Sequence, residues 1–160
     1  MREGVVKDLK QFVTFVIGSE NYGVPVLKVQ EIIGMTEIVH VPNSPDFMKG
    51  VINLRGSVVP VIDMRSRFRM DEREYDMFTV IIIVEVKDML VGMIVDSVSD
   101  VVDMPAEDIQ KTPNFTVKID TDYIEGIGQI ADKLVIILDI EKILSSEELG
   151  AMESDDVATT

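Results

Sequence analysis

The ionisable residues of this sequence do not form a recognisable catalytic set. Cysteine is absent, which excludes thiolate metal sites, and His40, the single histidine, has no second histidine to share a metal with. Asp63, Asp96 and Asp139 each end an apolar segment, but none is followed by the Thr-Gly or Ser-Gly of a paired-carboxylate protease. We expect these aspartates to cap short helices instead. We expect no catalytic residue, no metal and no cofactor, and therefore not an enzyme.

One arginine lies in the middle of an almost entirely apolar segment. Arg55 falls within the apolar segment GVINLRGSVVPVID at 50–63, directly before Gly56. One interpretation is an exposed turn residue between two strands, because isolated surface arginines are common. The other is an anchor in a protein–protein interface, where arginine is enriched. In that case we expect Glu31 to orient the guanidinium, which serves geometry more than stability because an exposed ion pair contributes little.

Composition and charge narrow the class of partner. The 160 residues are 46% hydrophobic and 28% charged, as in a globular domain, and 29 acids against 15 bases give a net charge of -14. This charge argues against binding to nucleic acid and to anionic lipid. No apolar run approaches the about 20 residues that span a membrane, and the N-terminus lacks a secretory signal. We expect a cytoplasmic protein, not inserted in the membrane, with protein partners.

Short segments rich in valine and isoleucine predict a mainly β fold. No helical pattern of about 12 residues or more interrupts them, which favours a barrel or a sandwich. His40 is expected to face out of one of these strands or into a polar rim. Short helices are expected at 27–33, from Pro105 onwards and at 140–149. The predicted strands are 12–18, 22–27, 37–42, 50–54, 57–63, 77–86, 89–98 and 134–140.

A weak internal repeat relates the two halves of the chain. The aligned segments are 50–68 with 126–144, which matches Gly50 to Gly126 and Asp63 to Asp139, and 21–33 with 90–102, which matches Gly23 to Gly92. A unit of about 60 residues is small for independent stability, so we expect two related barrels on a common core. The termini, 1–10 and 150–160, lack apolar periodicity and are expected to be flexible.

Five segments carry a family resemblance: YGVPVLKVQEI (22–32), VPNSPDFMKGVINLRGSVVPVIDMRSRF (41–68), VGMIVDSVSDVV (91–102), YIEGIG (123–128) and LVIILDIEKIL (134–144). Together they resemble the CheW family of bacterial chemotaxis coupling proteins. The resemblance implies two SH3-like five-stranded β-barrels around a shared hydrophobic core, with short flanking helices. It predicts a single domain at 11–149, with barrels at about 11–75 and 76–149 whose boundaries can interleave.

The resemblance implies a non-catalytic adaptor with two protein partners. It would couple the cytoplasmic tip of chemoreceptors to the histidine kinase CheA, and would be recruited to membrane-bound receptor arrays. Gly50 is expected to be glycine because a larger side chain would fill the docking groove. Ile33 stands where some members carry a basic residue. The receptor-binding residues implied by motif are Val29, Glu31, Gly50, Asn53 and Arg55.

The kinase-facing surface implied by the family lies mainly on the second barrel and would bind the regulatory domain of CheA. Phe115 is expected to make a second, weaker contact with another kinase subunit. For each valine of this surface, plain core packing is an equal alternative, because valine is usually buried. The kinase-binding residues are thus Val80, Val98, Val101 and Phe115.

A rival to the adaptor is a regulatory-domain-like SH3 barrel protein that binds another signalling kinase or scaffold, such as the homologous domain of CheA itself. The start at Met1 and the short acidic tail favour a free adaptor. The CheV fusion is not expected, because no receiver domain follows residue 150. An enzyme with a carboxylate site lacks an acid–base constellation, and a small nucleic-acid-binding barrel conflicts with the charge.

Overall fold

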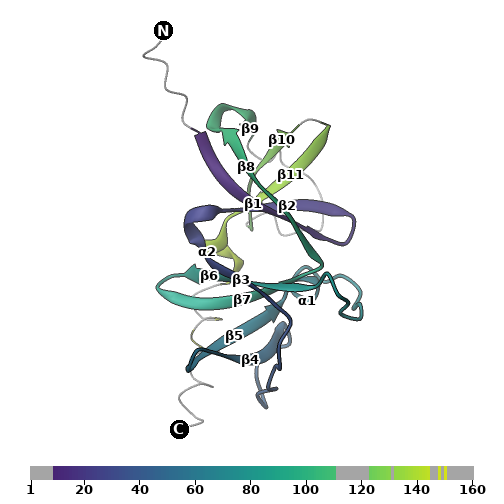
Figure 1. Cartoon of the computed structure of the whole chain (residues 1–160), viewed down its shortest axis with the longest axis vertical. Helices are drawn as coiled ribbons and strands as arrows, with labels where there is room; N and C mark the ends of the chain where they lie inside the picture. The colour runs from purple at the N-terminus through teal and green to yellow at the C-terminus, as the bar shows by residue number, and fades with distance from the viewer. Residues whose placement is uncertain (1–8, 111–122, 131, 145–147, 149, 151–160) are drawn as a thin grey trace.

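Two β-sheets make up most of the structure, a computed structural model that describes residues 9–110, 123–130, 132–144, 148 and 150. In Figure 1 the six-stranded sheet forms the upper part of the molecule and the five-stranded sheet the lower part, with the short helix α2 (Ile140–Ile143) between them. The predicted mainly β, SH3-like fold is confirmed. In the described part of the chain each sheet keeps two edge strands, so the sheets are open and not fully closed barrels.

The six-stranded sheet combines strands from both ends of the chain. β1 pairs antiparallel with both β2 and β8, and β2 pairs parallel with β11. β1 is apolar on both faces, because Phe15 packs into the core between the sheets while Phe12 packs on the opposite face. In spatial order the strands are β8 (Ser97–Pro105), β1 (Leu9–Ile17), β2 (Glu20–Pro25), β11 (Lys133–Leu138), β10 (Ile124–Ile130) and β9 (Ile109–Gln110).

The five-stranded sheet takes strands from the middle of the chain. β6 is largely buried, with Ile82 facing the other sheet and Ile81 and Ile83 facing a second cluster on the outer side. β5 and β7 pair in parallel, while the other neighbours are antiparallel. In spatial order the strands are β3 (Val29–Gly34), β6 (Val80–Val86), β7 (Met89–Val95), β5 (Ser57–Asp63) and β4 (Met48–Leu54).

The internal repeat corresponds to a matching strand order in the two sheets. β8-β1-β2-β11-β10 and β3-β6-β7-β5-β4 have the same arrangement, including the parallel pairs β2/β11 and β5/β7. Gly50 and Gly126 both lie at a register shift, between β4 and β5 and between β10 and β11. The sheets interleave along the chain: β1 and β2 join β8, β10 and β11, whereas β6 and β7 join β3, β4 and β5. The two halves have therefore exchanged their first two strands.

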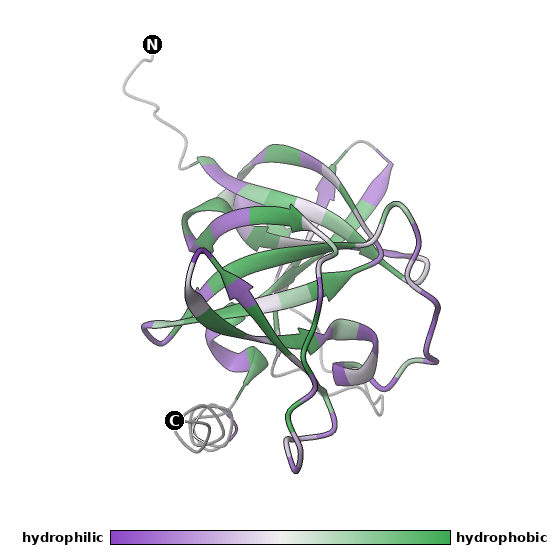
Figure 2. Cartoon of the chain, turned by 60° about the horizontal axis from the view of Figure 1, so that its bottom comes forward, coloured by the Kyte–Doolittle hydropathy of each residue, from purple (hydrophilic) through white to green (hydrophobic). Residues whose placement is uncertain are grey.

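One hydrophobic core is shared by both sheets, as the sequence predicts. It includes Phe15 and Val24 from the six-stranded sheet and Ile82 and Met93 from the five-stranded sheet, all buried. Figure 2 shows the apolar residues concentrated along the strands and the hydrophilic residues at the turns. Because each sheet covers an apolar face of the other, burial of this interface is the main stabilising contribution to the fold.

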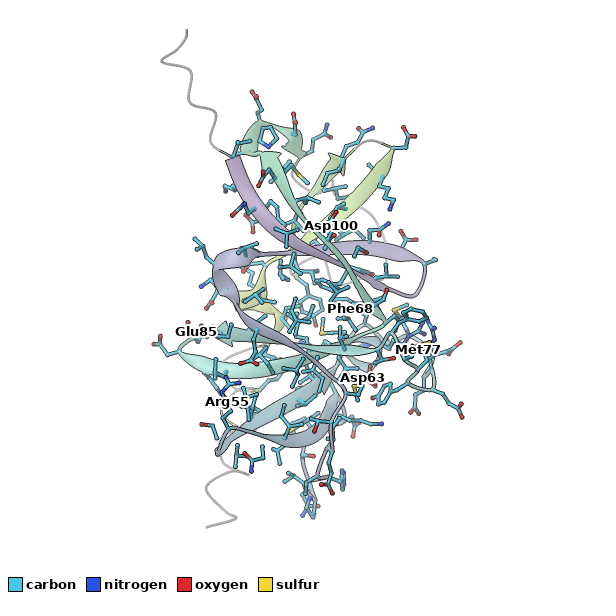
Figure 3. All side chains as sticks on the ribbon, viewed as in Figure 1. Arg55, Asp63, Phe68, Met77, Glu85 and Asp100 are labelled. Atoms are coloured by element: carbon cyan, nitrogen blue, oxygen red, sulfur yellow. The ribbon has the colours of Figure 1, made fainter. Side chains whose placement is uncertain are left out.

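A ladder of aromatic rings crosses the space between the sheets. Phe15, Tyr22, Phe68 and Tyr123 stack in succession, with ring centroids 6.0, 5.5 and 6.0 Å apart, and Phe68 lies centrally between the sheets in Figure 3. The guanidinium of Arg67 lies 4.7 Å from the Tyr123 ring centroid. Such stacked pairs add to the stabilisation from burial and fix the relative position of the sheets.

The helices are shorter than the sequence pattern predicts. The segment expected as a helix at 27–33 forms a 3₁₀ turn, η1 (Val26–Lys28), followed by strand β3. The segment after Pro105 forms a similar turn, η2 (Ala106–Asp108), followed by β9. The helix expected at 140–149 stops at Ile143, because Leu144 is extended. The first prediction rested on apolar spacing and the second on the proline and acids that often begin a helix. In both cases pairing with a neighbouring strand, β6 or β10, decides the conformation.

The strand predicted at 37–42 does not form. Val39 makes a single antiparallel bridge to Val51, with N–H···O distances of 2.8 and 2.9 Å, and His40 is exposed beside it. Pro42 and Pro45 follow, and proline cannot donate the hydrogen bonds that a longer ladder requires. The segment therefore crosses β4 at one point instead of extending the sheet.

Candidate partner-binding surface

An ion pair joins edge strand β3 of the five-stranded sheet to the turn between β4 and β5. Glu31 lies on β3, and not on the helix expected from the sequence, while Arg55 occupies the turn between β4 and β5. The guanidinium binds both carboxylate oxygens, one through Nη1 at 3.1 Å and the other through Nη2. This bidentate geometry orients the planar guanidinium at the surface.

The turn that carries Arg55 is held in an uncommon conformation. Arg55 has φ 51° and Gly56 has φ 91°, both in the left-handed region. Asn53 stabilises the turn by accepting a hydrogen bond from the Gly56 N–H at 2.7 Å. Asn53 and Arg55 are both exposed. The structure thus brings three of the predicted receptor-binding residues, Glu31, Asn53 and Arg55, to one end of the sheet.

Glu31 and Arg55 each shift the pKa of the other. Hydrogen bonds from Arg55 lower the pKa of Glu31 below its ordinary value, and the charge of Arg55 acts in the same direction. The Glu31 hydrogen bond and charge raise the pKa of Arg55 in turn. Both groups are therefore charged near neutral pH, and the arginine side chain is 71% exposed, so it remains available to a partner.

Gly50 and Val29 differ from the other three residues in their burial. Val29 is half-buried at the start of β3 and packs against the shared core. Gly50 is buried, and a Cβ built there would collide with the carbonyl oxygen of Val39 and approach Ile38 Cγ2 to 2.8 Å. The need for glycine is therefore explained by a close approach within this chain, at a backbone φ of 156°.

Replacing Gly50 by valine is expected to destabilise the domain by about 2–3 kcal/mol, because the new side chain would clash with backbone that cannot move freely. Gly34→Ala serves as the matched control, since a Cβ at Gly34 meets nothing within 4 Å. Urea unfolding of the two variants and the wild type measures the difference. Equal midpoints for Gly50→Val and wild type would show that the backbone around Val39 can move to accommodate the new side chain without loss of stability.

The predicted kinase-binding valines lie at different depths. Val80 begins β6 and Val98 lies near the start of β8, and both are half-buried and pack against the shared core. Val101 is 54% exposed on β8, an edge strand of the six-stranded sheet. Phe115 lies outside the described residues. Of these positions, Val101 offers an apolar side chain directly to a partner.

The three aspartates divide between two roles. Asp63 caps α1 (Met64–Arg67) by accepting from the Arg65 N–H at 2.9 Å, and Asp139 caps α2 by accepting from the Glu141 N–H at 3.0 Å. The capping prediction is thus confirmed for these two and is wrong for Asp96. That residue is followed by β8 and has no helix to cap.

Asp96 instead joins three parts of the fold. Its carboxylate accepts from the Gly18 N–H at 2.8 Å, from Arg65 at 3.0 and 2.7 Å, and from Arg73 at 3.2 Å. Burial raises the pKa of Asp96, but the hydrogen bonds from Arg65 and Gly18 and the two positive charges outweigh it, so the pKa is lowered. Sequence reasoning missed this network, because Asp96 and its partners are far apart in the sequence.

The described part of the chain holds neither a candidate metal site nor a membrane-spanning helix. No group of three or more histidine, cysteine, aspartate or glutamate side chains there is arranged to hold a metal ion. Within the same residues, no helix has the length and apolar character needed to cross a membrane.

Comparison with known proteins relates this architecture to a family. A sequence model described as the CheW-like domain matches residues 11–148. The chemotaxis protein CheW of Klebsiella aerogenes is 43% identical over 145 residues, which cover 91% of this chain and 87% of that protein. The chemotaxis protein CheW of Rhizobium meliloti is 32% identical over 142 residues, covering 89% and 92%.

A solved structure agrees with the sequence comparison. The crystal structure of the scaffolding protein TtCheW from Thermoanaerobacter tengcongensis superposes with a TM-score of 0.81 at 34% identity, and the match covers 87% of this chain and 94% of that one. Family model, curated relatives and solved structure thus agree over most of the chain. This chain belongs to the CheW family.

Proposed function

We propose that this chain is a non-catalytic chemotaxis adaptor that couples chemoreceptors to the histidine kinase CheA. Membership of a family whose relatives are named chemotaxis proteins supports the adaptor role, as does similarity to a protein described as a scaffold. The observation that carries the proposal is the Glu31–Arg55 pair, which presents an oriented, exposed arginine at the surface. In the cell the protein is cytoplasmic and joins membrane-bound receptor arrays.

The receptor-binding surface is assigned to the end of the five-stranded sheet. Arg55 is the anchor, Glu31 positions it, and Asn53 holds the turn. Val29 lies on the same edge strand as Glu31, half-buried against the shared core. Gly50 contributes by permitting the close passage of the Val39 segment, and not by direct contact.

The kinase-binding surface is assigned to the edge strand β8. Val101 is its most exposed valine, while Val98 and Val80 are half-buried and pack against the shared core. An exposed edge strand with an apolar side chain can receive a partner by packing or by added strand hydrogen bonds. Phe115 remains a candidate for a further kinase contact. The alternative partner, another signalling kinase or scaffold, would be bound through the same strand.

Replacing Val101 by lysine is expected to weaken binding to the regulatory domain of CheA about tenfold or more, because a charge would be placed in an apolar contact. Isothermal titration against that domain tests the proposed function directly, with micromolar or tighter one-to-one binding by the wild type. Val39→Lys is the matched control, since Val39 is 56% exposed on the other sheet. Wild-type kinase affinity in Val101→Lys would remove β8 from the interface, and no binding by the wild type would contradict the coupling role.

A further inference from the structure

An apolar tip is exposed on the loop at 71–78, which connects α1 to β6. Met77 and Phe78 are 87% and 64% exposed, and Tyr75 beside them is 37% exposed. Apolar side chains that are adjacent and this exposed commonly mark an interaction site. Figure 3 shows Met77 on the side of the molecule opposite Arg55, so the tip is separate from the proposed receptor site.

The tip is fixed by a tight turn around Asp76. The Asp76 carboxylate accepts from the Phe78 N–H at 2.8 Å and from Arg73 at 2.8 Å, and the Asp76 N–H donates to Thr79 Oγ1 at 2.9 Å. The Phe78 N–H is the main cause of a lowered pKa at Asp76. The carboxylate is therefore charged at neutral pH, and the turn persists without a partner.

Two anchors hold the loop against the fold. Arg73 binds Asp96 at 3.2 Å, and the Tyr75 hydroxyl donates to the carboxylate of Asp63, a buried residue, at 2.7 Å. Burial and the Asp63 hydrogen bond raise the pKa of Tyr75, so that its hydroxyl keeps the proton it donates. A segment held in place before binding loses less conformational entropy on association, so the loop is well suited to present its tip.

The charge around the tip indicates the chemistry of its partner. Residues 71–76 carry four carboxylates and one arginine, and that arginine, Arg73, binds Asp96 and Asp76. Glu72 and Glu74 are exposed, and Lys49 lies over the Tyr75 ring at 5.4 Å from its centroid. The tip is therefore an apolar protrusion surrounded by acidic residues. Such a surface is complementary to an apolar pocket rimmed by lysine or arginine.

We propose that Met77 and Phe78 form a second docking element that inserts into an apolar, basic-rimmed pocket on the regulatory domain of the kinase. This inference rests on the proposed function. Asp96, which anchors the loop, directly precedes β8, the strand assigned to the kinase, whereas Arg55 lies on the opposite side. A second copy of this chain is a poor occupant, because its net charge of -14 repels an acidic loop.

Isothermal titration of the full chain against the CheA regulatory domain tests the inference. Phe78→Ser is expected to lower the affinity about tenfold, and Met77→Ser about threefold, because aromatic anchors dominate such contacts. Leu134→Ser is the matched control: Leu134 is 61% exposed on β11, and its loss should change the affinity less than about twofold. Reversing both acids, Glu72→Lys with Glu74→Lys, should weaken binding most at low salt.

Several outcomes would overturn the inference. Wild-type affinity in Phe78→Ser and Met77→Ser would remove the tip from the interface while leaving the adaptor role intact. If these variants lost receptor binding and kept kinase binding, the tip would contact the receptor, and the proposed kinase contact would be wrong. Sedimentation of the wild type as a dimer that Phe78→Ser dissociates would make a second copy the occupant. Failure of the wild type to bind the kinase would overturn the inference together with the proposed function.

Discussion

Replacing Arg55 by alanine is expected to lower the affinity for the cytoplasmic fragment of a chemoreceptor about tenfold or more, because arginine is often one of the few residues that dominate the binding energy of an interface. The variant loses the positive charge and the planar bidentate group that Glu31 orients. The melting temperature should stay close to that of the wild type, because the ion pair is exposed. Isothermal titration and thermal unfolding on the same preparation measure both effects.

Two variants separate an anchor from a structural link. Arg69→Ala is the matched control, because Arg69 is also exposed and has a left-handed φ of 60°, against 51° for Arg55. The double exchange Glu31→Arg with Arg55→Glu keeps an ion pair between β3 and the β4–β5 turn but moves the cation, so receptor binding should not return. Undiminished receptor affinity in Arg55→Ala would show that the Glu31–Arg55 pair only connects β3 to the β4–β5 turn.

Replacing Asp96 by alanine is expected to be the most destabilising change of those considered, at about 2–4 kcal/mol, because Arg65 would be left largely buried without its partner. The side chains of Arg65 and Asp96 are only 16% and 12% exposed. Urea unfolding measures the loss, with Asp103→Ala as the control at an exposed position of β8, the strand that follows Asp96. A midpoint equal to that of Asp103→Ala would show that the network does not contribute to stability.

The same carboxylate predicts a pH dependence. Because the pKa of Asp96 is lower in the folded chain, its stabilising contribution is fully present above the unfolded value of about 3.9. It is lost as the pH falls below that value through the folded pKa, where both states become protonated. Asp96→Asn should therefore show a shallower loss of stability than the wild type over this acidic window. Parallel profiles for the two proteins would contradict this assignment.

Much of the fold follows from local patterns. Strands rich in valine and isoleucine, the glycine matches Gly50/Gly126 and Gly23/Gly92, and the capping roles of Asp63 and Asp139 all have equivalent places in the two sheets. These features depend on neighbours in the sequence or on the period of a strand, so a single sequence contains them. The Glu31–Arg55 pair was also predictable, because the repeat placed both residues within one unit.

What the sequence could not provide is the choice of distant partners. Residues 29–34 carry apolar spacing that fits a helix or a strand, and pairing with β6 selects the strand. Asp96 has the appearance of a helix cap, yet Arg65 and Gly18 meet it only in the folded chain. The depth of Val80 and Val98 against the exposure of Val101 likewise depends on how the sheets pack. Exposure of Met77 and Phe78 had no local signal.

The exchange of strands between the two halves has a consequence for synthesis. The ribosome releases β1 and β2 first, but their other neighbours, β8 and β11, are among the last strands made. A two-stranded hairpin alone is at best marginally stable. The N-terminal hairpin therefore cannot pair with its other neighbours until most of the chain is translated, and Phe12 and Phe15 stay unburied until then. Such non-local pairing slows folding and prolongs exposure to aggregation, so newborn chains depend on rapid completion or on chaperone protection.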